Sequence, residues 1–187
     1  MNEMLTPTGR QCDGCTMCCK LLAVKDLDKP RAVWCEHCAI GKGCTIYEAR
    51  PEACRNYYCA YMTRATIAEH WRPEHSGMVI VWGLERGRVS IHVDPERPNV
   101  WREEPYRSDI DLWMAIWPPD VLQIVIYFGL NVRALLPDRE IDLGMLPEED
   151  WIVTEMVPSP NGFRPEVYTM KPDDPRALEI ERQRARA

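Results

Sequence analysis

The sequence predicts an α+β protein with two parts. The amino-terminal part is cysteine-rich and contains a helix but few other regular elements, and it packs on a small carboxy-terminal domain of mixed helices and strands. Three observations support this class. All nine cysteines precede residue 60, apolar residues recur with helical spacing between residues 51 and 70, and β-rich runs separated by turn residues follow Gly77. The expected boundaries are 10–75 for the cysteine-rich region, 76–175 for the α+β domain and 176–187 for a charged tail.

The cysteine-rich region has one candidate for a long helix. Before Thr45 the chain is punctuated by glycine and proline and shows little periodicity. Pro51 is suited to a first helical position, and Glu52 follows it in the first turn. We therefore expect a helix from about Pro51 to His70 that stops before Pro73.

The carboxy-terminal region begins with a predicted β-hairpin. Met78–Leu84 and Arg88–Val93 are β-rich runs, and Gly87 between them can supply a positive φ. Pro95 and Pro98 end the hairpin.

A helix and several further strands follow. Ser108 is a candidate N-cap for a helix through Trp117, which Pro118 and Pro119 then break. The apolar segment Asp120–Phe128 fits either a buried helix capped by Gly129 or a buried strand, and we favour the helix. Three later segments are predicted strands: Val132–Leu136, Trp151–Val157 and Glu166–Met170.

Composition restricts the class of protein. With 187 residues and 45% hydrophobic residues, the chain can bury a core of its own. A net charge of -6 argues against a general nucleic-acid binder. The longest apolar stretch, Val121–Gly129, is too short to span a bilayer, and Met1–Arg10 does not resemble a secretory signal. We therefore expect a cytoplasmic protein with neither nucleic acid nor a membrane as partner.

The cysteines are the strongest functional signal. A reducing cytoplasm argues against a disulfide framework, and packing alone explains only one or two scattered cysteines. Clustering of nine thiols is typical of metal ligands. The expected ligands are Cys12, Cys15, Cys18, Cys19, Cys35, Cys38, Cys44, Cys54 and Cys59.

The spacing of these cysteines favours more than one metal. Cys12 and Cys15 have the C-x2-C spacing of a metal knuckle, in which backbone N–H groups bond the thiolates. Adjacent thiols at Cys18 and Cys19 rarely converge on one ion. If Cys54 and Cys59 share a helix, they point about 140° apart, so they serve different metals unless the helix is broken between them.

Counting ligands leaves two arrangements of zinc and one of iron. Two separate tetrathiolate zinc sites use eight cysteines, whereas three zinc ions with bridging thiolates use all nine. A [4Fe–4S] cluster needs four thiolates and can coexist with a zinc site. We favour two or three zinc ions, with the [4Fe–4S] cluster as the alternative. A set of metal-free redox thiols is the remaining interpretation.

Two segments resemble a known family. The first is Cys12–Cys19, which has the pattern C-x2-C-x2-C-C, and the second is Gly43–Arg55, which reads GCTIYEARPEACR. Both resemble the bacterial cysteine-cluster proteins of the CxxCxxCC type. These proteins are described as carrying a zinc- or iron-chelating domain. The resemblance covers about residues 10 to 60.

The resemblance implies a ligand set. It assigns metal binding to Cys12, Cys15, Cys18, Cys19, Cys44 and Cys54, with Cys35 or Cys38 as an intermediate ligand. This chain departs from the family's pattern because it has two intermediate cysteines and because Cys59 is an addition.

Other residues near the cysteines have smaller expected roles. Thiolate centres carry negative charge, and four neighbouring cations can offset it: Lys20, Lys42, Arg50 and Arg55. Cys35 and Cys38 form a second C-x2-C knuckle, and His37 lies inside it, where side chains usually point away from the metal. His70 and His75 do not have the spacing of a zinc protease, and His92 is expected to be structural. The seven tryptophans are expected to anchor the core.

Three functions follow from this interpretation. The first is a zinc-binding module that fixes a fold for recognising a protein partner or for buffering metal. The second is a redox protein with a [4Fe–4S] cluster and an additional zinc site, and the third is a metalloenzyme with one open site. We favour the first, because all nine thiols are assigned as ligands and no open position for catalysis is implied.

Overall fold

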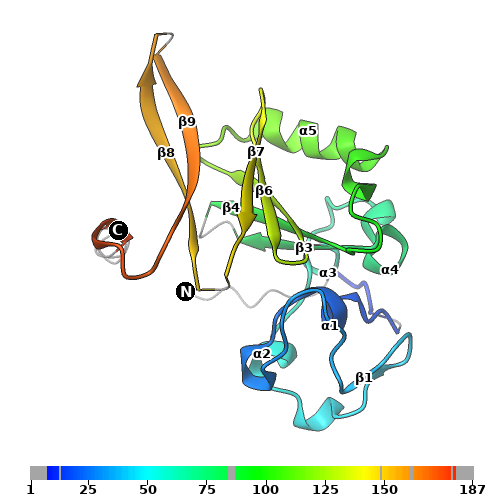
Figure 1. Ribbon diagram of the computed structural model, residues 1–187. Coiled ribbons are helices and arrows are strands. Elements are labelled where there is room, and N and C mark those ends of the chain that lie inside the picture. The colour runs from blue at the N-terminus through cyan, green and yellow to red at the C-terminus, as the bar shows by residue number, and fades with distance from the viewer. Residues whose placement is uncertain are drawn as a thin grey trace.

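A computed structural model describes residues 8–12, 14–83, 87–147, 149–160, 162–177 and 179 (Figure 1). Both helices and strands are present, as the α+β class predicts. The cysteine-rich part contains only short elements, none longer than five residues among those described. In order they are α1 (Met17–Leu21), η1 (Lys25–Leu27), β1 (Cys38–Ala39), β2 (Gly43–Cys44), η2 (Tyr47–Ala49), α2 (Glu52–Arg55), α3 (Ala60–Thr63), η3 (Glu69–Trp71) and α4 (Pro73–Ser76).

The predicted helix from Pro51 to His70 is wrong. The chain ends α2 at Arg55, becomes extended at Cys59 with φ -68° and ψ 163°, and starts α3 at Ala60. Packing explains the interruption. Four side chains within the expected helix or just beyond it are buried in one core: Tyr61, Met62, Ile67 and Trp71. In a single helix they would point in directions spread over more than half of the circumference, so one face could not bury them all.

A five-stranded sheet follows the cysteine-rich part. Its strands are β3 (Met78–Gly83), β4 (Arg88–Val93), β5 (Gln123–Phe128), β6 (Asn131–Leu135) and β7 (Glu140–Met145), in that spatial order. β4 and β5 are parallel and the other neighbours are antiparallel. The crossover between β4 and β5 carries η5 (Val100–Arg102) and α5 (Tyr106–Ile116).

The predicted hairpin is confirmed. Met78 pairs with Val93 and Gly83 with Arg88, and Gly87 has a φ of +57°. Residues 84–86 of its turn lie outside the described residues.

Two predictions in the crossover region need correction. The α5 helix begins three residues earlier than an N-cap at Ser108 predicts, and Ser108 instead donates a hydrogen bond to the Glu104 carboxylate at 2.6 Å. The segment that was expected to be a helix, Asp120–Phe128, contains the central strand β5. Its buried β-branched residues pack on both faces of the sheet, which suits a strand with neighbours on both sides.

A long hairpin completes the fold. β8 (Trp151–Ser159) and β9 (Gly162–Met170) pair along their whole length and extend away from the sheet (Figure 1). The predicted strands Trp151–Val157 and Glu166–Met170 are therefore confirmed, with longer bounds. The predicted strand Val132–Leu136 corresponds to β6 within one residue, whereas β7 was not predicted. Of the predicted charged tail at 176–187, only residues 176, 177 and 179 are described.

The sheet has a core on each face. On one face, η3, η5 and α5 cover the strands with the buried tryptophans Trp71, Trp101 and Trp113. On the other face, β5 and β6 pack against Ile152 and Val167 of the β8–β9 hairpin. The α3 and η3 segments of the cysteine-rich part contribute to the first core, so the cysteines at residues 12–59 are attached to the sheet through it.

Among the described residues, no helix is long and apolar enough to cross a membrane.

Candidate metal centre

All nine cysteines lie in the described part of the chain, and none forms a disulfide. Cys12 is exposed and the other eight are partly buried. They come from six separate stretches: the loop before α1, α1 itself, the turn into β1, β2, α2 and the residue before α3. The local geometry of each stretch decides which thiols become neighbours.

The first loop forms the turn that the C-x2-C spacing predicts. The Cys15 N–H donates to the Cys12 carbonyl at 2.6 Å. Gly14 between them has a φ of +83°, and a Cβ placed on it would lie only 2.9 Å from the Gly41 carbonyl oxygen. A residue without a side chain is therefore required here, because two cysteine loops touch at this point.

The second loop has the same kind of turn and is tied to α1. The Cys38 N–H donates to the Cys35 carbonyl, and the Cys35 N–H donates to the Cys19 carbonyl, each at 3.0 Å. In the short β1–β2 ladder Cys38 lies directly opposite Cys44. Paired residues in a ladder present their side chains on the same side, so these two thiols are neighbours.

A first set of thiols consists of Cys12, Cys15 and Cys59. The three side chains line one small pocket of about 20 Å³, whose other lining residues are Gln11, Tyr61, Met62, Arg72 and Pro73. Burial raises the pKa of Cys15 to about 11, and the charges of Glu74, Cys12 and Cys59 add to the rise. The pKa of Cys59 is raised by burial and by Cys12. These thiols therefore lie within electrostatic reach of one another.

A second set of thiols consists of the other cysteines except Cys18, namely Cys19, Cys35, Cys38, Cys44 and Cys54. A hydrogen bond with Cys18 and burial raise the pKa of Cys19. Burial and then Cys19 raise the pKa of Cys38 to about 11. Burial raises the pKa of Cys54, with contributions from Cys19, Cys35 and Cys44. Burial and neighbouring thiols therefore make Cys19, Cys38 and Cys54 harder to ionise.

The two sets are neighbouring thiols rather than finished coordination shells. Among the described residues, no group of three or more His, Cys, Asp or Glu side chains is arranged to hold a metal ion. The chemistry of the donors nevertheless fits zinc or an iron–sulfur cluster, both of which bind thiolate. A cation between the sulfurs would also remove the repulsion that raises their pKa values.

Comparison with known proteins adds no relative. No family model, curated protein or solved structure matches this chain. The ligand assignment therefore depends on the residues themselves.

The histidines are engaged elsewhere. His70 lies 2.7 Å from the Asp109 carboxylate, and the Trp71 indole N–H donates to the same oxygen at 2.7 Å. His92 is stacked on Tyr127 with ring centroids 4.6 Å apart, and burial lowers its pKa to about 3. His37 lies in the second knuckle, where its ring nitrogen is 3.4 Å from Glu36.

The cations expected to offset thiolate charge divide into two kinds. The charge of Arg50 lowers the pKa of Cys54, and its guanidinium lies 3.6 Å from the Tyr47 ring centroid. Lys20 instead bonds Asp94 and Glu96. Lys29, which the sequence analysis missed, lowers the pKa of Cys19. Lys29 lies seven residues after Leu22, and its sequence position did not indicate a place near the cysteines. A β-bridge between Val24 and Lys29 folds the chain back and brings Lys29 toward α1.

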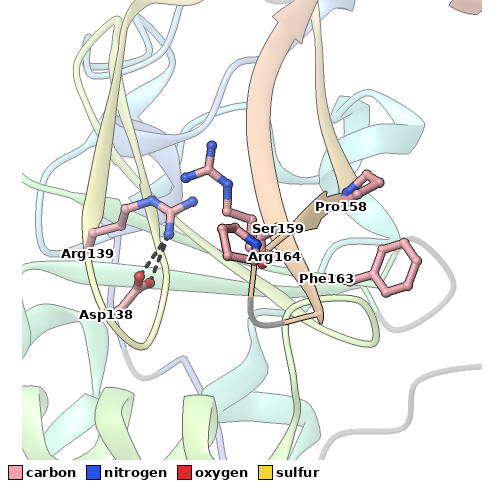
Figure 2. A pocket seen from close by; sticks show the side chains of 7 residues that line it. Asp138, Arg139, Pro158, Ser159, Phe163 and Arg164 are labelled. Carbon is pink, nitrogen blue, oxygen red and sulfur yellow. Dashed lines mark hydrogen bonds and ion pairs between the residues drawn. The ribbon is translucent and has the colours of Figure 1, made fainter.

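A larger hollow of about 560 Å³ lies beside the β8–β9 hairpin, away from the cysteines (Figure 2). Its cations are neutralised locally. Arg139 lies 2.9 Å from Asp138, as Figure 2 shows, and Arg164 lies 2.8 Å from Glu166. We assign no chemistry to this hollow.

Proposed function

We propose that this protein binds zinc through its cysteines, and that the metal fixes the cysteine-rich part for a structural or partner-recognition role. One observation carries this proposal. Residues 22–59, all of which the structure describes, contain no buried hydrophobic side chain, although the core on either side of this stretch includes Leu21 and Ala60.

A stretch without an apolar core needs another source of order. Fixing each residue's backbone costs about 1–2 kcal/mol, and apolar burial is the usual compensation. Residues 22–59 instead expose apolar side chains, with Val33, Ile40 and Tyr47 between 50% and 62% exposed. Small domains in this situation commonly use metal–thiolate bonds, whose binding free energy becomes folding free energy. Four of the nine cysteines lie in the interior of this stretch and Cys59 at its end.

The number of thiols supports two or three zinc ions. Nine thiolates are enough for two tetrathiolate sites or for three ions with bridging sulfurs. The pocket at Cys12, Cys15 and Cys59 has a volume of about 20 Å³, comparable with the space that one water molecule occupies. A single ion suits a space of this size. We propose that all nine cysteines are ligands, as the sequence predicts.

A second candidate is an iron–sulfur redox protein. Cys12, Cys15 and Cys18 have the C-x2-C-x2-C spacing found in iron–sulfur proteins, and Cys59 supplies a fourth thiol beside them. In this arrangement the remaining five cysteines hold zinc.

The proposed location is the cytoplasm. A reducing compartment preserves a cluster of nine thiols as free ligands for metal. The exposed apolar side chains of the cysteine loops would be held in fixed positions by the metal, which supports recognition of a protein partner.

Elemental analysis and a visible spectrum of protein purified without oxygen test the proposal. The expected result is two or three zinc ions per chain and no visible colour, because thiolate-bound zinc is colourless. A brown protein containing iron supports the second candidate. Folded protein with reduced thiols and no stoichiometric metal would contradict both.

A further inference from the structure

One edge of the β8–β9 hairpin has no neighbouring strand. Within the described part of the chain, β8 pairs only with β9, and Figure 1 shows the hairpin extending away from the larger sheet. The edge of β9 is held near the β6–β7 turn, because Arg139 of that turn donates a hydrogen bond to the Pro165 carbonyl at 2.6 Å. The opposite edge, on β8, stays open. An exposed edge strand offers its N–H and C=O groups to another chain.

Two contacts show which backbone groups point out of the hairpin. In an antiparallel pair, residues that bond the opposite strand alternate with residues whose N–H and C=O point outward. The Ile152 carbonyl accepts a hydrogen bond from Arg88 of β4, and the Pro165 carbonyl accepts the one from Arg139. Pro165 lies opposite Met156, which is four residues after Ile152. The outward-pointing set on β8 is therefore every second residue: Ile152, Thr154, Met156 and Pro158.

Met156 is the central available member of this set. The Ile152 carbonyl is already bonded to Arg88, and Pro158 has no N–H to donate. Proline is tolerated at such a position, because no bond to the opposite strand is lost. No other part of the described structure hydrogen-bonds the backbone of Thr154 or Met156. A further strand can therefore bond the N–H and C=O groups of both residues and the Pro158 carbonyl.

An apolar stripe runs along one face of the hairpin. Ile152 and Val167 on this face are buried in the core. Further from the core, Met156 is 38% exposed and Phe163 is 69% exposed. Side chains alternate between the two faces of a strand, and Phe163 lies opposite Pro158, so these side chains share one face. The stripe therefore continues from the core onto the exposed half of the hairpin, and a partner that pairs with β8 would cover part of it.

We propose that this edge of β8 pairs with the same edge of a second copy of the chain, antiparallel and centred on Met156. The two Met156 residues then lie opposite each other and exchange two hydrogen bonds. Each Thr154 N–H donates to the Pro158 carbonyl of the other copy. The joined hairpins form one sheet in the order β9–β8–β8–β9, in which the two Met156 side chains and the Pro165 opposite each of them make an apolar row.

Charge and hydrogen bonding favour this register over its neighbours. In it, each Glu155 lies opposite Val157 of the other copy. A register centred on Glu155 would place two carboxylates directly opposite each other, which is destabilising. A register centred on Thr154 would need the Ile152 carbonyl, which Arg88 occupies.

Antiparallel pairing also keeps the two bodies apart. Each chain has a net charge of -6, and like-charged molecules repel one another. Because the hairpin projects from the larger sheet (Figure 1) and the paired strands run in opposite directions, the two bodies lie at opposite ends of the joined hairpins. The contact involves only the outer half of each hairpin, so we expect a reversible dimer.

Opposite charges at position 156 test the pairing. Met156→Glu and Met156→Lys each place like charges at the centre, so each variant should dimerise at least about 10-fold more weakly than the wild type. An equimolar mixture of the two should form a heterodimer, because the facing charges then attract. Sedimentation equilibrium of the full chain with reduced thiols measures these associations. Met145→Glu is the matched control, because Met145 is 72% exposed at the end of β7, and it should dimerise as the wild type does.

Met156→Pro tests the backbone hydrogen bonds. It removes an N–H that points away from β9, so the hairpin should keep its own ladder, while dimerisation should weaken about 10-fold or more. Met156→Thr keeps the N–H and suits a strand, so it should dimerise more strongly than Met156→Pro. Equal circular dichroism of the two variants shows that both are folded.

Any of three results would overturn the inference. The first is a wild-type protein that stays monomeric up to about 1 mM. The second is a dimer of unchanged strength in Met156→Glu, and the third is a mixture that is no more dimeric than its two components. The inference does not depend on zinc, so each of these results leaves the proposed function standing.

Discussion

Replacing Lys20 with methionine tests whether this lysine serves the fold or the thiolates. Lys20 lies in α1 beside Cys18 and Cys19, but its Nζ lies 2.8 Å from Asp94 and 2.9 Å from Glu96. The side chains of Lys20 and Asp94 are only 7% and 12% exposed. Methionine preserves the length of the side chain and leaves the Asp94 carboxylate buried without this cation.

The expected effect is a large loss of stability without a loss of metal. Removing one partner of a buried ion pair costs about 3–5 kcal/mol. For a chain of this size, each kcal/mol lowers Tm by roughly 2–4 °C, which gives a decrease of roughly 6–20 °C. Thermal unfolding of the metal-loaded variant, followed by circular dichroism, measures the change, and elemental analysis should find the wild-type zinc content.

Two further variants make this test specific. Glu96→Gln changes a side chain that is 79% exposed, so it should cost less than about 1 kcal/mol. Adding Asp94→Asn to Lys20→Met should recover part of the lost stability, because it removes the unpaired charge. A Lys20→Met protein with wild-type Tm and reduced zinc content would refute this reasoning, since Lys20 would then neutralise the thiolates as the sequence alone suggested.

Three other predictions follow from the cysteine-rich part. Chelation of the metal should abolish hydrogen-exchange protection in residues 22–59, while the sheet keeps its protection. Loss of protection in both regions would show that the sheet depends on the metal too. Gly14→Ala should lower zinc affinity and stability by about 1–3 kcal/mol, and Gly9→Ala, which has a similar φ but no neighbour within 4 Å, should have the smaller effect. Metal-free protein should lose stability between pH 9 and 11. The pKa values of Cys15 and Cys38 rise from 9.0 to about 11 on folding. In this pH range the folded state therefore holds protons that the unfolded state has already released, which favours the unfolded state. Stability that is constant across this range in pH-dependent denaturation would contradict those raised values.

The elements that local sequence determines were predictable. The β3–β4 hairpin follows from two β-rich runs and from Gly87, the residue that adopts a positive φ. The predicted end of α5 at Trp117 agrees with the structure to within one residue, because the extended backbone of Trp117 leads into two prolines.

The elements that tertiary packing determines were not predictable. Nothing local separates a buried helix from a buried strand in Gln123–Phe128, and its parallel pairing with Arg88–Val93 decides the matter. The helix expected from Pro51 was interrupted because Tyr61, Met62 and Ile67 all reach the core, which no single helix face could bury. β7 carried the alternation of Ile141 and Leu143 with polar residues, a signal that the sequence analysis missed.

The membership of the candidate site was easier to predict than its division. Clustered cysteines identify the thiols, but spacing alone does not show that Cys59 lies in the pocket of Cys12 and Cys15. That contact depends on a break in the helix.

X-ray absorption at the zinc edge, on protein purified without oxygen, tests the central claim most directly. Zinc held by the cysteines predicts a coordination shell of four sulfur atoms at about 2.3 Å. A shell dominated by nitrogen or oxygen, or a sample without stoichiometric zinc, would contradict it.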